Sequence, residues 1–80
     1  MKDSEIVQQI DDLVAREHDL ERAHAADGLS ESDRERLQQI EVRLDQCWDL
    51  LRQRRARREA GKDPSEAQLR AAEVVEHYQQ

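Results

Sequence analysis

A run of apolar residues at helical spacing, with no proline or glycine between Leu37 and Gly61, most limits what this chain can fold into. Steps of three and four place these residues on one stripe of an α-helix. Strands are not expected, because no apolar–polar alternation persists along the chain. We therefore expect an all-α fold organised around this helix. The stripe consists of Leu37, Ile40, Leu44, Cys47 and Leu51, and Trp48 and Leu50 widen it.

Serines mark where this long helix should begin. Ser30 and Ser32 are each followed three residues later by an acid, which is the pattern of a capping box. The helix is therefore expected over about residues 31–60.

A first helix is expected over about residues 4–26, with Asp3 or Ser4 as its cap and Asp27-Gly28 closing its end. Its stripe follows the spacing of a coiled-coil seam, interrupted by polar groups. The members of this stripe are Ile6, Ile10, Leu13, Glu17, Leu20 and His24.

The short loop between the two helices should fold them into an antiparallel hairpin over residues 1–62. Pairing residues about this loop sets Ile10 near Cys47 and Ile6 near Leu51. Position 54 then faces Asp3, so the rest of the second helix should extend beyond the first.

The remaining segment, residues 63–80, is expected to be a short C-terminal helix or a mobile tail. Asp63-Pro64-Ser65-Glu66 is a typical helix start, with aspartate as the cap and proline in the first turn. The predicted helix runs from Pro64 to about His77. Periodicity leaves open whether it docks on the hairpin, exchanges with a partner chain, or frays.

The apolar faces of the hairpin are wider than one partner helix can cover. Trp48 falls beside the stripe, where its indole would face water in an isolated hairpin, and exposed aromatic area is typical of an interface. Val7 and Val14 widen the first helix in the same way. We therefore expect a homodimeric four-helix bundle. The self-association residues are expected to be Leu44, Trp48 and Leu51.

Charge is distributed unevenly along the chain, whose net charge is −6. Residues 1–49 hold fourteen acids and six bases, residues 52–62 hold six bases and one acid, and residues 63–80 hold four acids and one base. The overall acidity argues against DNA binding, since phosphates would be repelled.

The basic segment contains a cluster of arginines with two interpretations. One is structural, because arginines complement the C-terminal end of a helix and acids such as Asp3 lie near enough to neutralise them. The other is a binding site for an acidic protein or, less favoured, for RNA. A membrane surface is not expected, because the cluster lacks apolar anchors. The candidate partner-binding residues are Arg52, Arg54, Arg55, Arg57 and Arg58.

Catalytic, cofactor and metal sites are not expected. No glycine-rich phosphate loop or nucleophile elbow is present. Cys47 is the single cysteine and lies on the stripe, so we interpret it as a packing residue. His18, His24 and His77 do not share a helix face, and a zinc site built from them with Cys47 is not expected.

The segment DQCWDLLRQRRARREAG, residues 45–61, is the most specific part of a resemblance that covers nearly the whole chain. Together with the leading helix, the Asp-Pro turn and the EVVEHY tail, it resembles a family of short actinobacterial proteins, domain-of-unknown-function family 2630. The resemblance implies a small helical protein of the bacterial cytoplasm and assigns no functional residues.

These patterns together favour a small non-enzymatic helical interaction or adaptor protein that self-associates and binds an acidic partner through its arginines. The alternative is a small ribosome- or RNA-associated factor. A cytoplasmic location is expected, because no signal-peptide pattern or membrane-spanning apolar run is present and a lone cysteine is typical of a reducing compartment.

Overall fold

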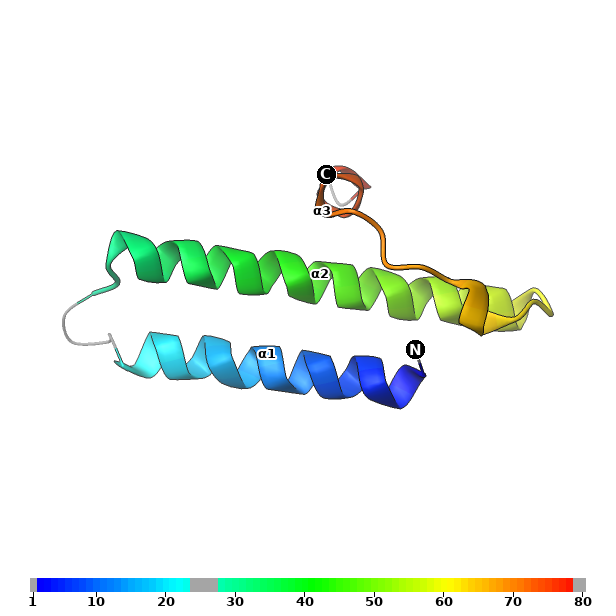
Figure 1. The fold of residues 1–80 in the computed structure, drawn as a ribbon, viewed down its shortest axis with the longest axis horizontal. Coiled ribbons are helices and arrows are strands. Elements are labelled where there is room, and N and C mark those ends of the chain that lie inside the picture. Colours follow the sequence, from blue (N-terminus) through cyan, green and yellow to red (C-terminus); the bar gives the residue numbers. More distant parts are fainter. Residues whose placement is uncertain (1, 24–27, 79–80) are drawn as a thin grey trace.

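The computed structural model describes residues 2–23 and 28–78, in which the first two helices form an antiparallel hairpin (Figure 1). Helix α1 spans Asp3–Ala23 and helix α2 spans Glu31–Glu59. A 3₁₀ turn, η1, follows at Pro64–Glu66, and a short helix, α3, occupies Ala72–Tyr78. The described residues contain no strand. The molecule measures 51 × 25 × 14 Å, and the all-α hairpin predicted from the sequence is confirmed.

Both ends of α2 are capped, and the serine cap at its start is the one that the sequence predicts. Ser30 is the N-cap: its Oγ accepts a hydrogen bond from the Asp33 amide at 3.2 Å and donates to the Asp33 carboxylate at 2.8 Å. At the other end Gly61 has a φ of 72°, and the Lys62 amide donates to the Arg57 carbonyl at 2.7 Å. This Schellman-type end places the left-handed backbone on a glycine, where it costs least.

The predicted end of the first helix at Asp27-Gly28 lies partly outside the described residues. Gly28 itself has a φ of 75°, which is the left-handed conformation expected of it.

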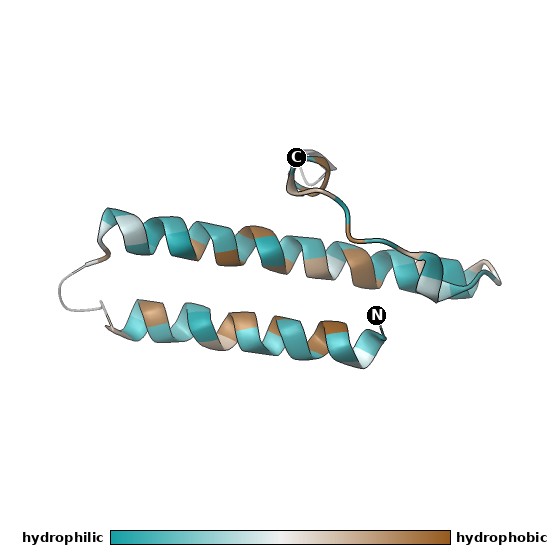
Figure 2. Cartoon of the chain, in the orientation of Figure 1, coloured by the Kyte–Doolittle hydropathy of each residue, from teal (hydrophilic) through white to brown (hydrophobic). Residues whose placement is uncertain are grey.

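The core lies between the first half of α1 and the middle of α2. Ile6, Ile10, Cys47 and Leu50 are its buried members, and Ile10 and Cys47 thus share one cluster, in agreement with the predicted register. Nearer the loop the two helices leave an open groove of about 510 Å³ lined by Leu13, Leu20 and Ile40 among others. Hydrophobic residues along both long helices are interspersed with hydrophilic ones (Figure 2). Partly buried residues around the core are Leu13, Val14, Leu44, Leu51 and Ala67.

The predicted short C-terminal helix is confirmed as α3, but it does not run without interruption from Pro64 to about His77 as expected. Asp63 caps the segment as expected, accepting from the Ser65 amide at 2.9 Å, but the helical turn ends at Glu66 and residues 67–71 form no helix. We call residues 67–78 the C-terminal arm.

Two side-chain amides of α2 explain why the start of the arm is not helical. Gln53 Nε2 donates to the Gln68 carbonyl at 2.8 Å, and Gln46 Nε2 donates to the Arg70 carbonyl at 3.1 Å. These bonds satisfy carbonyls that a helix would otherwise pair internally. The chain then reaches α3, which crosses α2 on the side away from α1 (Figure 1). Val75 of α3 is buried, with 1% of its surface exposed.

Cys47 packs in the core, with its Sγ 3.7 Å from Gln9 Oε1, and burial raises the pKa of its thiol. A thiol reagent at neutral pH should therefore label the native protein slowly and the denatured protein fast. The Cys47→Ala variant should lose about 1 kcal/mol of unfolding free energy, because it removes one buried atom and leaves a small cavity. Fast labelling of the native chain would contradict this packing role.

Candidate functional site: the arginine-rich end of α2

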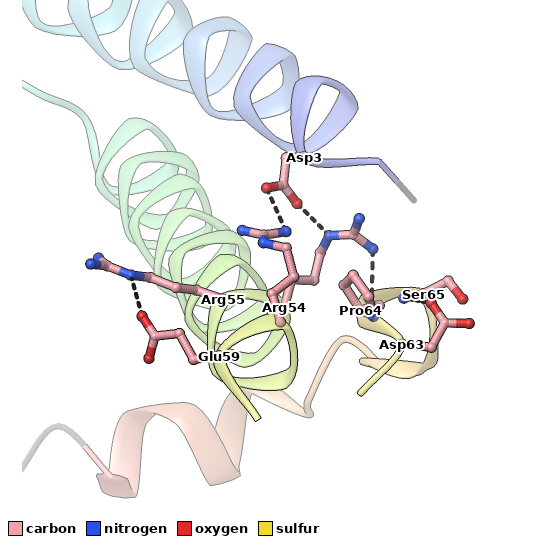
Figure 3. Close-up of polar contacts among 8 residues, drawn as sticks. Asp3, Arg54, Arg55, Glu59, Asp63, Pro64 and Ser65 are labelled. Atoms are coloured by element: carbon pink, nitrogen blue, oxygen red, sulfur yellow. Dashed lines mark hydrogen bonds and ion pairs between the residues drawn. The ribbon is translucent and has the colours of Figure 1, made fainter. Parts of the chain in front are cut away.

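Arg54 is the centre of the arginine cluster and is buried, with 8% of its surface exposed. Its Nε forms an ion pair with the Asp3 carboxylate at the start of α1, as the predicted register requires. Its Nη1 donates to the Pro64 carbonyl at 3.2 Å. Figure 3 shows Arg54 lying between Asp3 and the turn that contains Pro64. One guanidinium therefore joins α1, α2 and η1.

Asp3 is shared between two arginines. Its Oδ2 lies 2.9 Å from Arg58 Nη1, while its Oδ1 contacts Arg54. The hydrogen bond from Arg54 and the positive charges of both arginines hold the pKa of Asp3 below its usual range. Asp63, on the turn beside them, also has a lowered pKa, chiefly because the Ser65 amide and hydroxyl bond to its carboxylate.

The other three candidate arginines each lie near an acid of the same chain. Arg55 Nε is 3.2 Å from Glu59, Arg57 Nη1 is 3.3 Å from Glu66, and Arg52 Nη2 is 3.9 Å from Asp49. The side chains of Arg55 and Arg52 are 77% and 56% exposed. The exposed pair of Arg55 and Glu59 contributes little to stability, and Arg52 is more than half exposed although its partner Asp49 is buried. Both guanidinium groups therefore remain accessible to a partner.

The structure thus separates the five predicted partner-binding residues by accessibility. Arg54 is committed to internal contacts, and Arg57 is 34% exposed beside the turn that holds Glu66. Arg58 is 45% exposed and pairs with Asp3. Arg52 and Arg55 are the most accessible of the set, and Figure 3 shows Arg55 pointing away from the Asp3–Arg54 pair.

Asp49 is a charged residue that sequence reasoning missed. It is 5% exposed, and its carboxylate accepts from Gln53 Nε2 at 2.9 Å and lies 3.5 Å from Arg70 Nε of the arm. Arg52 and Gln53 follow it at three and four residues, which signals a pairing. Nothing in the sequence indicates that Asp49 is buried, because its burial depends on the arm lying over α2.

Three cationic side chains border a groove of about 360 Å³ between the end of α2 and the returning chain. Arg57 and Arg70 both lie within salt-bridge distance of an acid, so their charges are partly compensated. The groove is lined by Gln53, Ala56, Arg57, Ala60, Lys62 and Arg70.

The predicted self-association residues lie on one side of the hairpin, at the edge of its core: Leu44 and Leu51 are partly buried against that core, and Trp48 is exposed. Successive helical residues are rotated by about 100°, so Trp48 and Arg55 share one side of α2 while Gln46, which binds the arm, lies on the opposite side. The Trp48 surface is 50% exposed. Val7, 45% exposed, lies on the matching side of α1. We call this surface the Trp48 face; it comprises Val7, Val14, Leu44, Trp48 and Leu51.

Within residues 2–23 and 28–78, no three His, Cys, Asp or Glu side chains are grouped as a metal site would require. His24, one of the predicted non-ligands, lies outside those residues. In the same part of the chain, no helix is both long and apolar enough to span a membrane.

The ion pairs of Asp3 with Arg54 and Arg58 should make the stability of the fold depend on pH. Because the folded-state pKa of Asp3 is lowered, its stabilisation is present above the ordinary value of 3.8 and is lost as the pH falls through the lowered pKa. Asp3→Asn should therefore lower the midpoint of thermal unfolding at pH 7, and the difference from wild type should shrink on acidification. Glu5→Gln, which removes another acid from the first turn of α1, is the control. Equal effects of the two variants would assign the loss to the helix dipole.

The chain has relatives among mycobacterial proteins. The family described as Protein of unknown function (DUF2630) matches residues 2–80. An uncharacterized protein of Mycobacterium bovis and one of Mycobacterium tuberculosis are each 53% identical to the chain over 77 residues, which cover 95% of this chain and 88% of theirs. No solved structure matches the chain. The resemblance seen in the sequence is confirmed, and the chain belongs to the DUF2630 family.

Proposed function

We propose that this chain is a small non-enzymatic interaction protein of the cytoplasm, which forms a homodimer through the Trp48 face and binds an acidic protein through its accessible arginines. The observation that carries the proposal is the half-exposed indole of Trp48 on a face that the C-terminal arm leaves open. A large aromatic side chain in water is costly to keep without a partner, and tryptophan is enriched at the centres of interfaces.

The small core supports self-association. The buried apolar residues of the described chain are Ile6, Ile10, Cys47, Leu50 and Val75. A chain of 80 residues with a core of this size gains stability by pairing with a second copy. Two hairpins meeting through their Trp48 faces would form a four-helix bundle, in which Leu44 and Leu51 become core residues.

The positions of Arg52 and Arg55 support the proposal that the partner is acidic. They follow Trp48 by four and seven residues, so all three side chains lie along one side of α2. Both arginines are more than half exposed. A guanidinium offers bidentate donors to a carboxylate, and a carboxylate of a partner can compete with Glu59, which is itself 68% exposed.

The alternative function, an RNA-associated factor, rests on the same arrangement of Trp48, Arg52 and Arg55 along α2. An exposed indole beside two guanidinium groups can stack an unpaired base and contact its phosphates. The net charge of −6 opposes the approach of a polyanion, whereas an acidic patch on a folded protein carries less charge. We therefore favour the protein partner.

Trp48→Ala should convert the dimer to a monomer at micromolar concentration, or weaken it at least about tenfold, because the variant removes the largest side chain of the proposed interface. Sedimentation equilibrium measures the change. Val74→Ala is the matched control, because Val74 is also 50% exposed but lies on α3. A wild-type chain that is monomeric and unfolds cooperatively at high temperature would contradict self-association.

Arg52→Gln combined with Arg55→Gln should leave helicity unchanged and reduce binding of a fluorescent glutamate-rich peptide. Arg22→Gln is the control, since Arg22 pairs with Asp19 at 3.4 Å and is 81% exposed on α1. Binding is measured by anisotropy at two salt concentrations, in parallel with a single-stranded RNA of equal length. Preferential, salt-sensitive binding of the RNA that depends on the same arginines would favour the alternative instead.

A further inference from the structure

A groove runs along one side of the hairpin, between its loop and its core. The opening of about 510 Å³ nearer the loop continues into a second of about 300 Å³, since Leu13 and Arg16 line both. Along α1 the two openings extend from Gln9 to Leu20, which is about 16 Å of helix. We call this surface the side groove; it is defined by Leu13, Arg16, Leu20, Arg36, Ile40 and Arg43.

The side groove lies across the hairpin from the Trp48 face. Arg43 precedes Trp48 by five residues, which places the two side chains about 140° apart around the axis of α2. Leu20 and Ile40 are partly buried, but neither packs against the buried cluster of the core. The groove therefore offers aliphatic surface that is not used by the core of the hairpin.

Three arginines of the side groove form no salt bridge within the described chain. The chain has eleven arginines, all of them described, and seven lie within salt-bridge distance of an acid. Arg16, Arg36 and Arg43 are three of the other four. The positions three and four residues from Arg43 on either side hold no acid, so α2 offers it no local pair. These guanidinium groups are therefore free to pair with carboxylates of another molecule.

Two aspartates of α1 also border the openings. Asp19 is 3.4 Å from Arg22, and Asp12 accepts from Gln8 Nε2 at 3.1 Å. The lining thus holds three unpaired arginines and two aspartates, one of which already has a cationic partner. The net charge of the groove is positive, which favours an acidic occupant over a basic one.

The shape of the side groove favours a helix. The groove is open along its length, so it cannot enclose a small ligand as a binding pocket does. The backbone amides of α1 and α2 are bonded within their own helices, so an extended peptide would find no strand edge to pair with. A helix satisfies its own backbone and can lay an aliphatic stripe on Leu20 and Ile40.

The spacing of the arginines on α2 fits the same occupant. Arg36 and Arg43 are seven residues apart, which is two helical turns or about 10 Å. Two acids seven residues apart on a helix that lies alongside α2 would therefore reach both guanidinium groups. Charged residues that flank an apolar seam select the partner helix of a coiled coil in this way.

We propose that the side groove binds an acidic amphipathic helix of a partner protein, which packs its aliphatic stripe on the leucines and the isoleucine of the groove and pairs its carboxylates with the three arginines. The bound helix forms a three-helix bundle with the loop end of the hairpin. This site is separate from Arg52, Arg55 and the Trp48 face, so it can fail its test while the proposed function passes, and the reverse.

The probe is a fluorescent peptide made of about three repeats of Glu-Leu-Ala-Ala-Leu-Glu-Ala, whose flanking glutamates keep it from pairing with itself. Binding to the full chain should raise the anisotropy of the peptide and the helicity measured by circular dichroism. The same peptide with lysine in place of glutamate should bind at least about tenfold more weakly, because its charges repel the arginines.

Arg36→Gln combined with Arg43→Gln should weaken binding of the acidic peptide at least about tenfold. Arg34→Gln combined with Lys62→Gln is the matched control, because it removes two exposed charges outside the groove, and it should bind as the wild type does. Leu20→Gln should also weaken binding while leaving the helicity of the free chain unchanged, since Leu20 lies outside the buried core.

The proposal is overturned if the wild type does not bind the acidic peptide, if the two peptides bind equally, or if the groove variant binds as its control does. It is also overturned if Arg52→Gln combined with Arg55→Gln abolishes binding, which would place the peptide beside Trp48. Two further results would assign the groove to a different occupant and overturn the proposal: a dimer of the wild type that the groove variant converts to a monomer, or displacement of the peptide by an equal concentration of single-stranded RNA.

Discussion

The ion pair between Asp3 and Arg54 is the contact on which the arrangement of the chain depends. It forms where α1 begins, where the hairpin core ends and where the chain turns back through η1, and the Arg54 guanidinium touches all three segments. A buried guanidinium without partners would be strongly unfavourable, so the three segments must meet there together. The pair thereby fixes how far α1 and α2 overlap, and it leaves the remaining turns of α2 for the returning chain.

The two sides of α2 make different kinds of contact. Towards α1 it offers, besides Arg54 and Arg58, aliphatic side chains and Cys47, which pack by shape. Towards the arm it offers glutamine amides and the buried Asp49, so docking there depends on hydrogen bonds and ion pairs. The hairpin therefore has an apolar core in addition to its ion pairs, whereas most contacts of the arm described above are polar.

The hairpin could be predicted from the sequence because its determinants are local or periodic. Ser30 and Gly61 signal the ends of α2, and the stripe together with a short loop sets Ile10 against Cys47. The arm could not be predicted, because helical periodicity does not show that Gln46 and Gln53 will donate to a backbone distant in sequence. The arginines could likewise be predicted as a cluster with position 54 opposite Asp3, while the contact of Arg54 with the Pro64 carbonyl came only from the tertiary structure.

The hydrogen bonds of Gln46 and Gln53 also fix which residues of the returning chain lie against α2. Carbonyls two residues apart point the same way in an extended strand, which allows those of Gln68 and Arg70 to meet donors on one side of α2. Inserting or deleting a single residue between Gly61 and Gln68 would shift which carbonyls reach these two amides. Across the family, the length of this connection should therefore vary less than its amino-acid composition.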